Sequence, residues 1–232
     1  MEDRYTRSRP VNPLIYSAPF FQGLPQSAVE KAMTHLITRT YNANQVILQE
    51  NDWGSSVYFI LGGWVKVRTI NADGKEVTLN ILGKGELFGE MAALEQVPRS
   101  TDVITLTPTV MGNMPAQDFV HLIQTSPLAG VRLSQLMARR LRQVNQRLRN
   151  RESDSISRVA DTLLFLAEAQ GIQGQEGIEI PKLTHYELSS FSGLTRETVT
   201  RVLTKLEKKG LILRNQQALC IPDLQALERQ IV

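Results

Sequence analysis

Residues 89–100 carry the side chains of this chain that are best suited to chemistry. A glycine there lets the backbone approach a bound group closely, and free N–H groups at the start of a helical turn form a concave site for an anion. Arg99 can close over that anion with a bidentate contact. The segment predicts capture of a phosphate beside a sugar hydroxyl, with Glu90 accepting from the hydroxyl. A tight turn with a surface arginine is the structural alternative. The candidate residues are Gly89, Glu90, Met91, Ala92, Arg99 and Ser100.

Composition sets the class of protein. The chain has 232 residues, 42% apolar and 21% charged, as expected of a soluble globular protein with one large or two modest domains. No run approaches the roughly 20 apolar residues of a membrane span, and the N-terminus lacks the apolar core of a signal peptide. We therefore expect a cytoplasmic protein without a membrane partner.

Several kinds of catalytic site are not expected. The single cysteine, Cys220, excludes an internal disulfide and a cysteine-ligated metal or iron–sulfur site. His35, His121 and His185 show no ligand spacing, so no metal site is expected. The sequence has no nucleophile elbow, Walker loop or GxGxxG motif. These observations argue against an enzyme.

The positive charge is concentrated in the C-terminal half. Net charge is only +3, yet residues 131–151 contain seven arginines and no acid. This distribution suggests a polyanionic partner, with nucleic acid the first candidate. A solvated helix face is the alternative interpretation.

The pattern predicts two kinds of structure in the N-terminal half. Residues 1–18 are polar and rich in Arg and Pro and are predicted to form an arm, and residues 26–36 have helical spacing. Short alternating segments then predict a β-sandwich or small barrel, with Asp73-Gly74 as a hairpin turn. The predicted strands are 46–48, 57–61, 64–69, 77–82, 102–106 and 110–114.

A long helix is predicted after a short one at 115–123. Ser126-Pro127 is a favourable helix start. The residues that follow form a narrow apolar seam of the kind that pairs with a second copy, so we expect a homodimer. Packing of the seam on the barrel of the same chain is the alternative. The seam contains Val131, Ser134, Met137/Ala138, Leu141, Val144/Asn145 and Leu148.

The C-terminal region predicts a winged helix-turn-helix. Asp154 lies in a segment that can cap a helix over 156–169, and a short strand is predicted at 178–180. Thr184 and Glu187 have capping-box spacing, Gly193 ends that helix and Thr195 caps the next. Two short strands, 208–214 and 219–221, are predicted to form the wing.

Polar residues gather at the exposed start of the second helix, which is the part of a recognition helix that meets base edges. Arginine can contact guanine and glutamate can accept from cytosine, so a half-site containing G and C is expected. A surface pair of Glu197 with Arg201 is the alternative. The candidate DNA-binding residues are Thr195, Arg196, Glu197, Thr200, Arg201 and Lys205.

Three stretches together resemble the Crp/Fnr family of bacterial transcription regulators, and in particular cyanobacterial Crp-like regulators. They are 89–100, 132–141 and 192–201. The resemblance implies an α+β fold with a jelly-roll-like cyclic-nucleotide-binding β-roll, a long dimerisation helix and a C-terminal winged helix-turn-helix. The implied domains are the arm 1–18, the β-roll 19–125, the dimerisation helix 126–152 and the DNA-binding domain 153–232.

The resemblance also implies partners and site residues. Gly89, Glu90, Arg99 and Ser100 would hold the ribose and cyclic phosphate, and Arg140 would brace Glu90. The DNA would be double-stranded with a TGTGA-type palindrome, and a contact with RNA polymerase is expected.

The base-binding position departs from the cAMP pattern. Where cAMP-responsive members carry a Thr-Ser pair, this chain has Val144-Asn145. cAMP is the effector expected from the family, and cyclic di-GMP is a close second, because arginine suits its phosphates and guanines. The candidate cyclic di-GMP contacts are Arg4, Arg7, Arg9 and Arg142. The alternative is an effector-independent DNA-binding or protein-docking module with a vestigial pocket.

Overall fold

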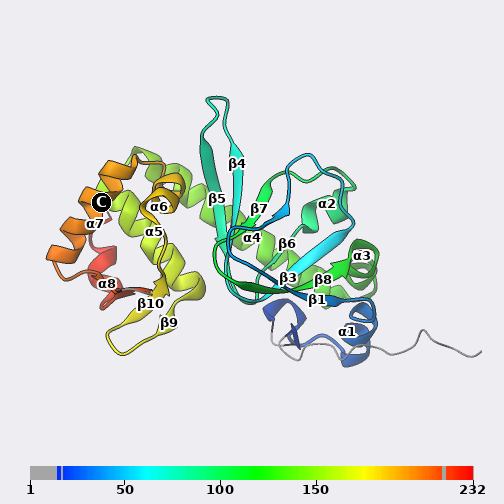
Figure 1. Cartoon of the computed structure of the whole chain (residues 1–232). Coiled ribbons are helices and arrows are strands. Elements are labelled where there is room, and N and C mark those ends of the chain that lie inside the picture. The colour runs from blue at the N-terminus through cyan, green and yellow to red at the C-terminus, as the bar shows by residue number, and fades with distance from the viewer. Residues whose placement is uncertain (1–14, 17, 216–217, 232) are drawn as a thin grey trace, which may run out of the picture. The chain divides into compact units, whose positions relative to one another are not determined.

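The computed structural model of the chain describes residues 15–16, 18–215 and 218–231. It divides into two compact units, Met1–Thr69 with Ile81–Arg139, and Ile70–Asn80 with Arg140–Val232. The boundaries fall inside a β-hairpin and inside the longest helix, and each unit is described by itself. Figure 1 shows the order of the elements along the chain. Among the described residues, no helix combines the length and the apolar character needed to cross a membrane.

The first unit is built on two four-stranded sheets with the strand orders β1-β8-β3-β6 and β2-β7-β4-β5. All six predicted strands are present, with ends that differ by a residue or so. Two further strands, β1 and β6, were not predicted, because β1 exposes most of its residues and β6 has only two. The strands are β1 Ile37–Tyr41, β2 Val46–Leu48, β3 Ser56–Gly62, β4 Val65–Ile70, β5 Glu76–Leu82, β6 Leu87–Phe88, β7 Asp102–Thr105 and β8 Thr109–Pro115.

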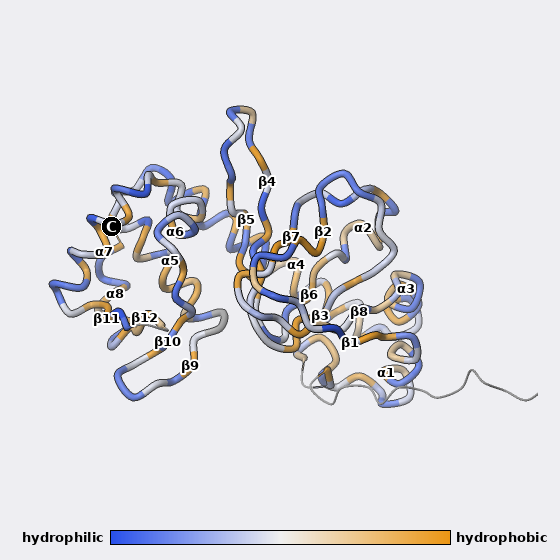
Figure 2. Tube along the Cα trace, viewed as in Figure 1, coloured by the Kyte–Doolittle hydropathy of each residue, from blue (hydrophilic) through white to orange (hydrophobic). Residues whose placement is uncertain are grey.

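The predicted hairpin turn joins β4 to β5. Gly74 has a φ of 74°, a left-handed conformation that glycine adopts without steric cost. The Asn71 side chain accepts from the backbone N–H groups of Asp73 and Lys75 at 3.0 and 2.9 Å. Hydrophilic and hydrophobic residues alternate along both strands (Figure 2), which is the pattern from which the strands were predicted.

Aromatic side chains fill the core of the first unit. Phe20 stacks on Phe119 with ring centroids 5.5 Å apart, and Phe21 lies 4.9 Å from Phe59. Ile15 and Ala18, at the end of the predicted arm, are buried in the same cluster. The helices around this core are the 3₁₀ turn Pro19–Phe21 and the α-helices α1 Gln26–Ala32, α2 Glu90–Glu95 and α3 Ala116–Thr125.

The longest helix, α4 (Pro127–Arg149), has two different apolar faces. Ala129, Leu133 and Leu136 are buried in the core of the first unit. Val131 and Leu141, on the seam predicted from the sequence, are 50% and 61% exposed. Met137, also on the predicted seam, packs against the core of the first unit, so the seam is exposed over most but not all of its residues.

The second unit contains the predicted helix-turn-helix and wing, although the first wing strand is limited to Leu213–Arg214 and Lys208 ends the preceding helix. Its four-stranded sheet has the order β11-β12-β10-β9; the two-residue strand β9 and helix α8 were not predicted. The elements after α4 are the 3₁₀ turn Asn150–Glu152, α5 Ser155–Gln170, β9 Ile172–Gln173, β10 Ile178–Pro181, α6 His185–Ser192, α7 Arg196–Lys208, β11 Leu213–Arg214, β12 Ala218–Ile221 and α8 Leu224–Glu228.

The predicted caps fix the ends of these helices. The Asp154 carboxylate accepts from the first turn of α5. Thr184 and Glu187 form a capping box at α6, and Gly193 ends that helix in a left-handed conformation with a φ of 66°. Thr195 accepts from Thr198 N–H at 3.2 Å and caps α7. The sharp turn between α6 and α7 follows from these local bonds.

Candidate effector and DNA-binding sites

The predicted phosphate loop joins β6 to β7 and contains α2. Gly89 caps α2 with a φ of 83°, in the left-handed region. Glu90 and Arg99 are only 3% and 4% exposed, and Ala92 is also buried. Met91 and Ser100 are exposed. A surface arginine beside a tight turn is excluded by the burial of Arg99.

Arg99 has a guanidinium with an incomplete set of hydrogen bonds. Nη1 donates to Gly89 O at 2.8 Å and Nη2 donates to Ser56 O at 2.7 Å. Nε is buried and has no hydrogen-bond partner. Burial lowers the pKa of the guanidinium, while the nearby Tyr58 and Glu90 oppose the shift. A buried guanidinium with an N–H group that lacks an acceptor can donate this hydrogen bond to a bound anion.

Two glycines leave room for this guanidinium. A Cβ at Gly54 would lie 2.5 Å from Nη2 and 2.6 Å from Nε of Arg99, and a Cβ at Gly89 would lie 2.8 Å from Nη1. The sequence pointed to Gly89 as a position of close approach. Gly54 was not predicted as a site residue, because nothing local in the sequence indicates that its turn meets Arg99.

Backbone bonds and an aromatic pair complete the surroundings of Arg99. Arg99 N donates to Asp52 O and Asn51 N donates to Arg99 O, both at 2.8 Å. Tyr58 stacks on Phe88 with centroids 5.0 Å apart. Burial raises the pKa of the Tyr58 hydroxyl, and Arg99 opposes that shift. The site therefore combines one buried cation with an aromatic wall.

The other effector candidates lie elsewhere. Arg140 is half-buried on α4, and Arg142, Val144 and Asn145 are exposed on the same helix. All four belong to the second unit, so their part in an effector site stays a prediction. Arg4, Arg7 and Arg9 lie outside the described residues.

The predicted recognition residues lie together on α7. Its buried face is formed by Val199, Val202, Leu203 and Leu206. The opposite face borders an open groove of about 770 Å³. The residues along this groove are Arg196, Glu197, Thr200, Arg201, Thr204, Lys205, Lys208 and Lys209. Thr195 is exposed at the start of the helix, where its hydroxyl also acts as the cap.

His185 on α6 supports this surface and was not predicted as a site residue. Its Nδ1 lies 2.7 Å from the Thr200 hydroxyl, which itself donates to Arg196 O at 2.9 Å. Since that bond uses the hydroxyl hydrogen, Nδ1–H of His185 must donate to Thr200. Burial lowers the pKa of His185, and the charges of Arg214 and Arg196 lower it further. His185 thus holds one of the predicted recognition residues, Thr200, in place.

Among the described residues, no three or more His, Cys, Asp or Glu side chains form a group that could hold a metal ion. The described part of the chain therefore offers no candidate metal site. Cys220 is buried, and burial raises the pKa of its thiol.

Two protein-family models match the chain. One, described as a cyclic nucleotide-binding domain, matches residues 38–126, and the other, a Crp-like helix-turn-helix domain, matches residues 157–230. The cyclic AMP receptor protein of Thermus thermophilus is 33% identical over 196 residues, which cover 84% of this chain and 88% of that protein.

Solved structures agree in fold. A CRP-family transcriptional regulator of Thermus thermophilus has a TM-score of 0.69 at 26% identity and covers 83% of this chain and 96% of its own. The c-di-GMP-responsive global regulator CLP of Xanthomonas campestris has a TM-score of 0.70 at 22% identity, with coverage of 86% and 100%. The combination of a β-roll, a long helix and a winged helix-turn-helix is thus found in a known regulator of the CRP family. This chain belongs to the Crp/Fnr family of transcription regulators.

Proposed function

We propose that this chain is a homodimeric, sequence-specific DNA-binding regulator controlled by a cyclic nucleotide. The observation that carries the proposal is the buried Arg99 guanidinium, whose Nε has no hydrogen-bond partner. Its other nitrogens donate to neutral carbonyl groups. A cyclic phosphate would supply the missing acceptor and place a negative charge against the guanidinium.

The remaining contacts of the effector follow from this anchor. The phosphate would be held by Ser100 and by the backbone of Gly89, Glu90, Met91 and Ala92. The Glu90 carboxylate would accept from the ribose hydroxyl. Arg140 would brace Glu90, and Val144 and Asn145 would meet the base. We take cAMP as the first candidate effector because the relative at 33% identity is a cyclic AMP receptor protein.

Cyclic di-GMP is the second candidate. Val144 cannot hydrogen-bond a base, so the residue pair that meets adenine in cAMP-responsive members is altered. A regulator of the same fold responds to c-di-GMP. Arg142, with Arg4, Arg7 and Arg9, would then bind the additional phosphate and guanine.

The exposed seam of α4 supports the homodimer. All residues of the predicted seam except the half-buried Met137 are exposed in the single chain, namely Val131, Ser134, Ala138, Leu141, Val144, Asn145 and Leu148. Pairing two such helices would bury the seam and place two copies of α7 for a two-fold palindrome of the TGTGA type. A contact with RNA polymerase would follow once the dimer is on DNA.

Calorimetric titration of the purified protein with cAMP, cGMP and cyclic di-GMP tests the effector. We expect cAMP to bind, and Arg99→Ala to weaken binding by about 10- to 100-fold, as for loss of hydrogen bonds to a charged group. Lys31→Ala, on the exposed side of α1, is the control and should bind like the wild type.

Fluorescence anisotropy with a palindromic duplex, with and without the nucleotide, tests the control of DNA binding. We expect the nucleotide to raise DNA affinity in the wild type and not in Arg99→Ala. Tight, specific DNA binding with no heat from any nucleotide would instead establish the effector-independent module.

A further inference from the structure

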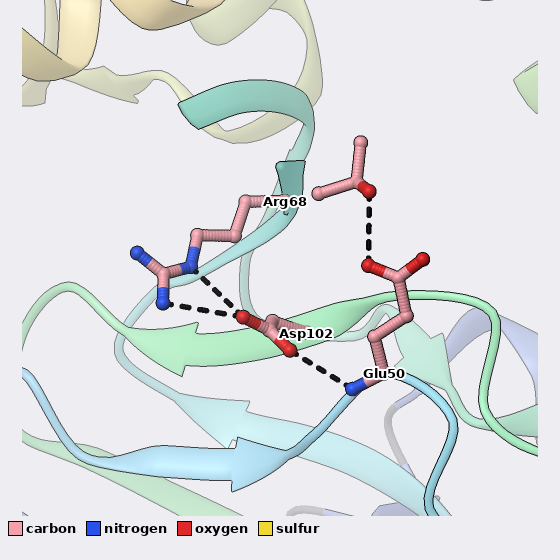
Figure 3. A network of polar contacts seen from close by, with 4 residues as sticks. Glu50, Arg68 and Asp102 are labelled. Carbon is pink, nitrogen blue, oxygen red and sulfur yellow. Dashed lines mark hydrogen bonds and ion pairs between the residues drawn. The ribbon is translucent and has the colours of Figure 1, made fainter. Parts of the chain in front are cut away.

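A network of four polar side chains lies on the sheet of β2, β7 and β4 (Figure 3). Arg68 places Nε and Nη2 each 3.2 Å from Asp102 Oδ2. The other carboxylate oxygen, Oδ1, accepts from Glu50 N–H at 2.9 Å. The Thr69 hydroxyl donates to Glu50 Oε2 at 2.9 Å. Asp102 is therefore the junction between a cation and a backbone N–H group.

The pair at the centre of this network is partly buried. The Arg68 and Asp102 side chains are 25% and 15% exposed. Solvent screens such a pair less than an exposed one, and two nitrogens of one guanidinium fix the direction of the carboxylate. The bond from Glu50 N–H to Asp102 consequently has a well-defined geometry.

The backbone that Asp102 holds leads directly to Arg99. After Glu50, Asn51 N donates to Arg99 O and Asp52 O accepts from Arg99 N, both at 2.8 Å. Gly54 lies in the same turn, and a Cβ added there would lie only 2.5 Å from Nη2 of Arg99, so this turn borders the guanidinium. A shift of the turn at 50–54 would therefore move both the backbone and the guanidinium of Arg99.

The turn itself needs outside support. Asn51 has a φ of 69°, in the left-handed region that residues other than glycine adopt at some cost in energy. A residue keeps such a backbone conformation when contacts with the surrounding structure stabilise it. Asp102 fixes the residue immediately before Asn51, and Arg99 fixes Asn51 itself.

We infer that Asp102, oriented by Arg68, is a positioning residue for the effector phosphate: it holds the turn at 50–54 in the conformation that places the Arg99 guanidinium. This inference rests on the proposed function, because it assigns a role in the same phosphate site. Asp102 acts through the turn and does not itself contact the nucleotide.

Substitutions at Asp102 test the inference by calorimetric titration with cAMP. Asp102→Val removes both acceptor oxygens and keeps a residue that favours a strand. We expect about tenfold weaker binding, as for loss of one charge-assisted hydrogen bond. Asp102→Asn keeps an oxygen for Glu50 N–H and should bind within about threefold of the wild type. Thr69→Val, which removes only a side-chain contact of Glu50, is the matched control and should be unchanged.

A second measurement separates positioning from general destabilisation. The Rp and Sp phosphorothioate analogues of cAMP replace one or the other exocyclic phosphate oxygen by sulfur. Displacement of Arg99 should change the ratio of their affinities in Asp102→Val, whereas partial unfolding would lower both affinities by the same factor. If Asp102→Val does not fold, Arg68→Met should change the same ratio.

Wild-type affinity and an unchanged phosphorothioate ratio in Asp102→Val, or in Arg68→Met if that variant is used, would overturn the inference while leaving the effector site intact. Failure of the wild-type protein to bind any cyclic nucleotide would instead overturn the proposed function.

Discussion

At the scale of single residues, Arg99 is a buried cation of the first unit. Its side chain is buried, its two terminal nitrogens donate to Gly89 and Ser56, and its Nε has no partner. Burying a charged group costs several kcal/mol unless an opposite charge compensates it. Backbone carbonyl groups satisfy hydrogen bonds without supplying a full negative charge. An anionic ligand would therefore stabilise the site as it binds.

The substitution Gly54→Ala tests the space reserved for this side chain. The added Cβ would lie 2.5 Å from Nη2 of Arg99, so the guanidinium must leave its position. We expect about tenfold weaker nucleotide binding, since a charged hydrogen bond would be lost. Calorimetry measures the change.

Gly62→Ala is the control for this substitution. A Cβ at Gly62 meets no atom within 4 Å, so nucleotide affinity should stay at the wild-type value. Unchanged affinity in Gly54→Ala as well would mean that the position of the guanidinium seen here is not required for binding.

At the scale of elements, local patterns predicted the fold well. The alternating strands, the turn at Gly74, the capping box of Thr184 and the left-handed Gly193 all depend on neighbours in the sequence. Strand β1 was missed because its residues are mostly exposed and show no alternation. Strands β6 and β9 have two residues each, too few for any periodicity.

The site residues could be predicted from the sequence only where they lie close to one another along the chain. Gly89 and Arg99 lie in one segment, and the exposed residues of α7 lie on one helix face. The turn that meets Arg99 and the histidine that holds Thr200 come from distant segments. Only the tertiary structure brings them to the site, so no spacing in the sequence could have indicated Gly54, Ser56 or His185.

The recognition helix α7 makes a distinct prediction for DNA. Arg196 is exposed at its first turn, the part of a recognition helix that is predicted to meet base edges. Arg196→Ala should relax base preference at one position of the site, at a cost of about 1–3 kcal/mol. Competition binding with single-base variants of the palindrome measures this preference.

Lys208 provides the matched comparison at the other end of α7. It is exposed in the last turn of the helix, away from the base-reading end. Lys208→Ala should weaken binding to all sequences alike and lower the salt dependence by about one unit of slope, as for a phosphate contact. Equal loss of specificity in both variants would contradict the assignment of Arg196.

At the scale of the whole molecule, α4 links both units, since residues 127–139 belong to the first and 140–149 to the second. One face joins the core of the β-roll, and the seam stays exposed. A helix that leaves such a seam to solvent is typical of one that pairs with a copy of itself. A dimer through α4 would connect each effector site to a pair of recognition helices, and a palindromic site would require that pair.

The dimer can be tested at Leu141, the most exposed apolar residue of the seam at 61%. Burial of a leucine contributes about 1.5–3 kcal/mol, and a symmetric dimer contains two copies. Leu141→Lys should therefore raise the dissociation constant of the dimer by about 100-fold or more, as measured by sedimentation equilibrium. Leu141→Met keeps the apolar contact and should remain dimeric.

Because a monomer can bind only one half-site, Leu141→Lys should also lose most of its affinity for the palindrome while keeping its affinity for cAMP. A Leu141→Lys protein that sediments as the wild-type dimer would show that this face of α4 is not the interface.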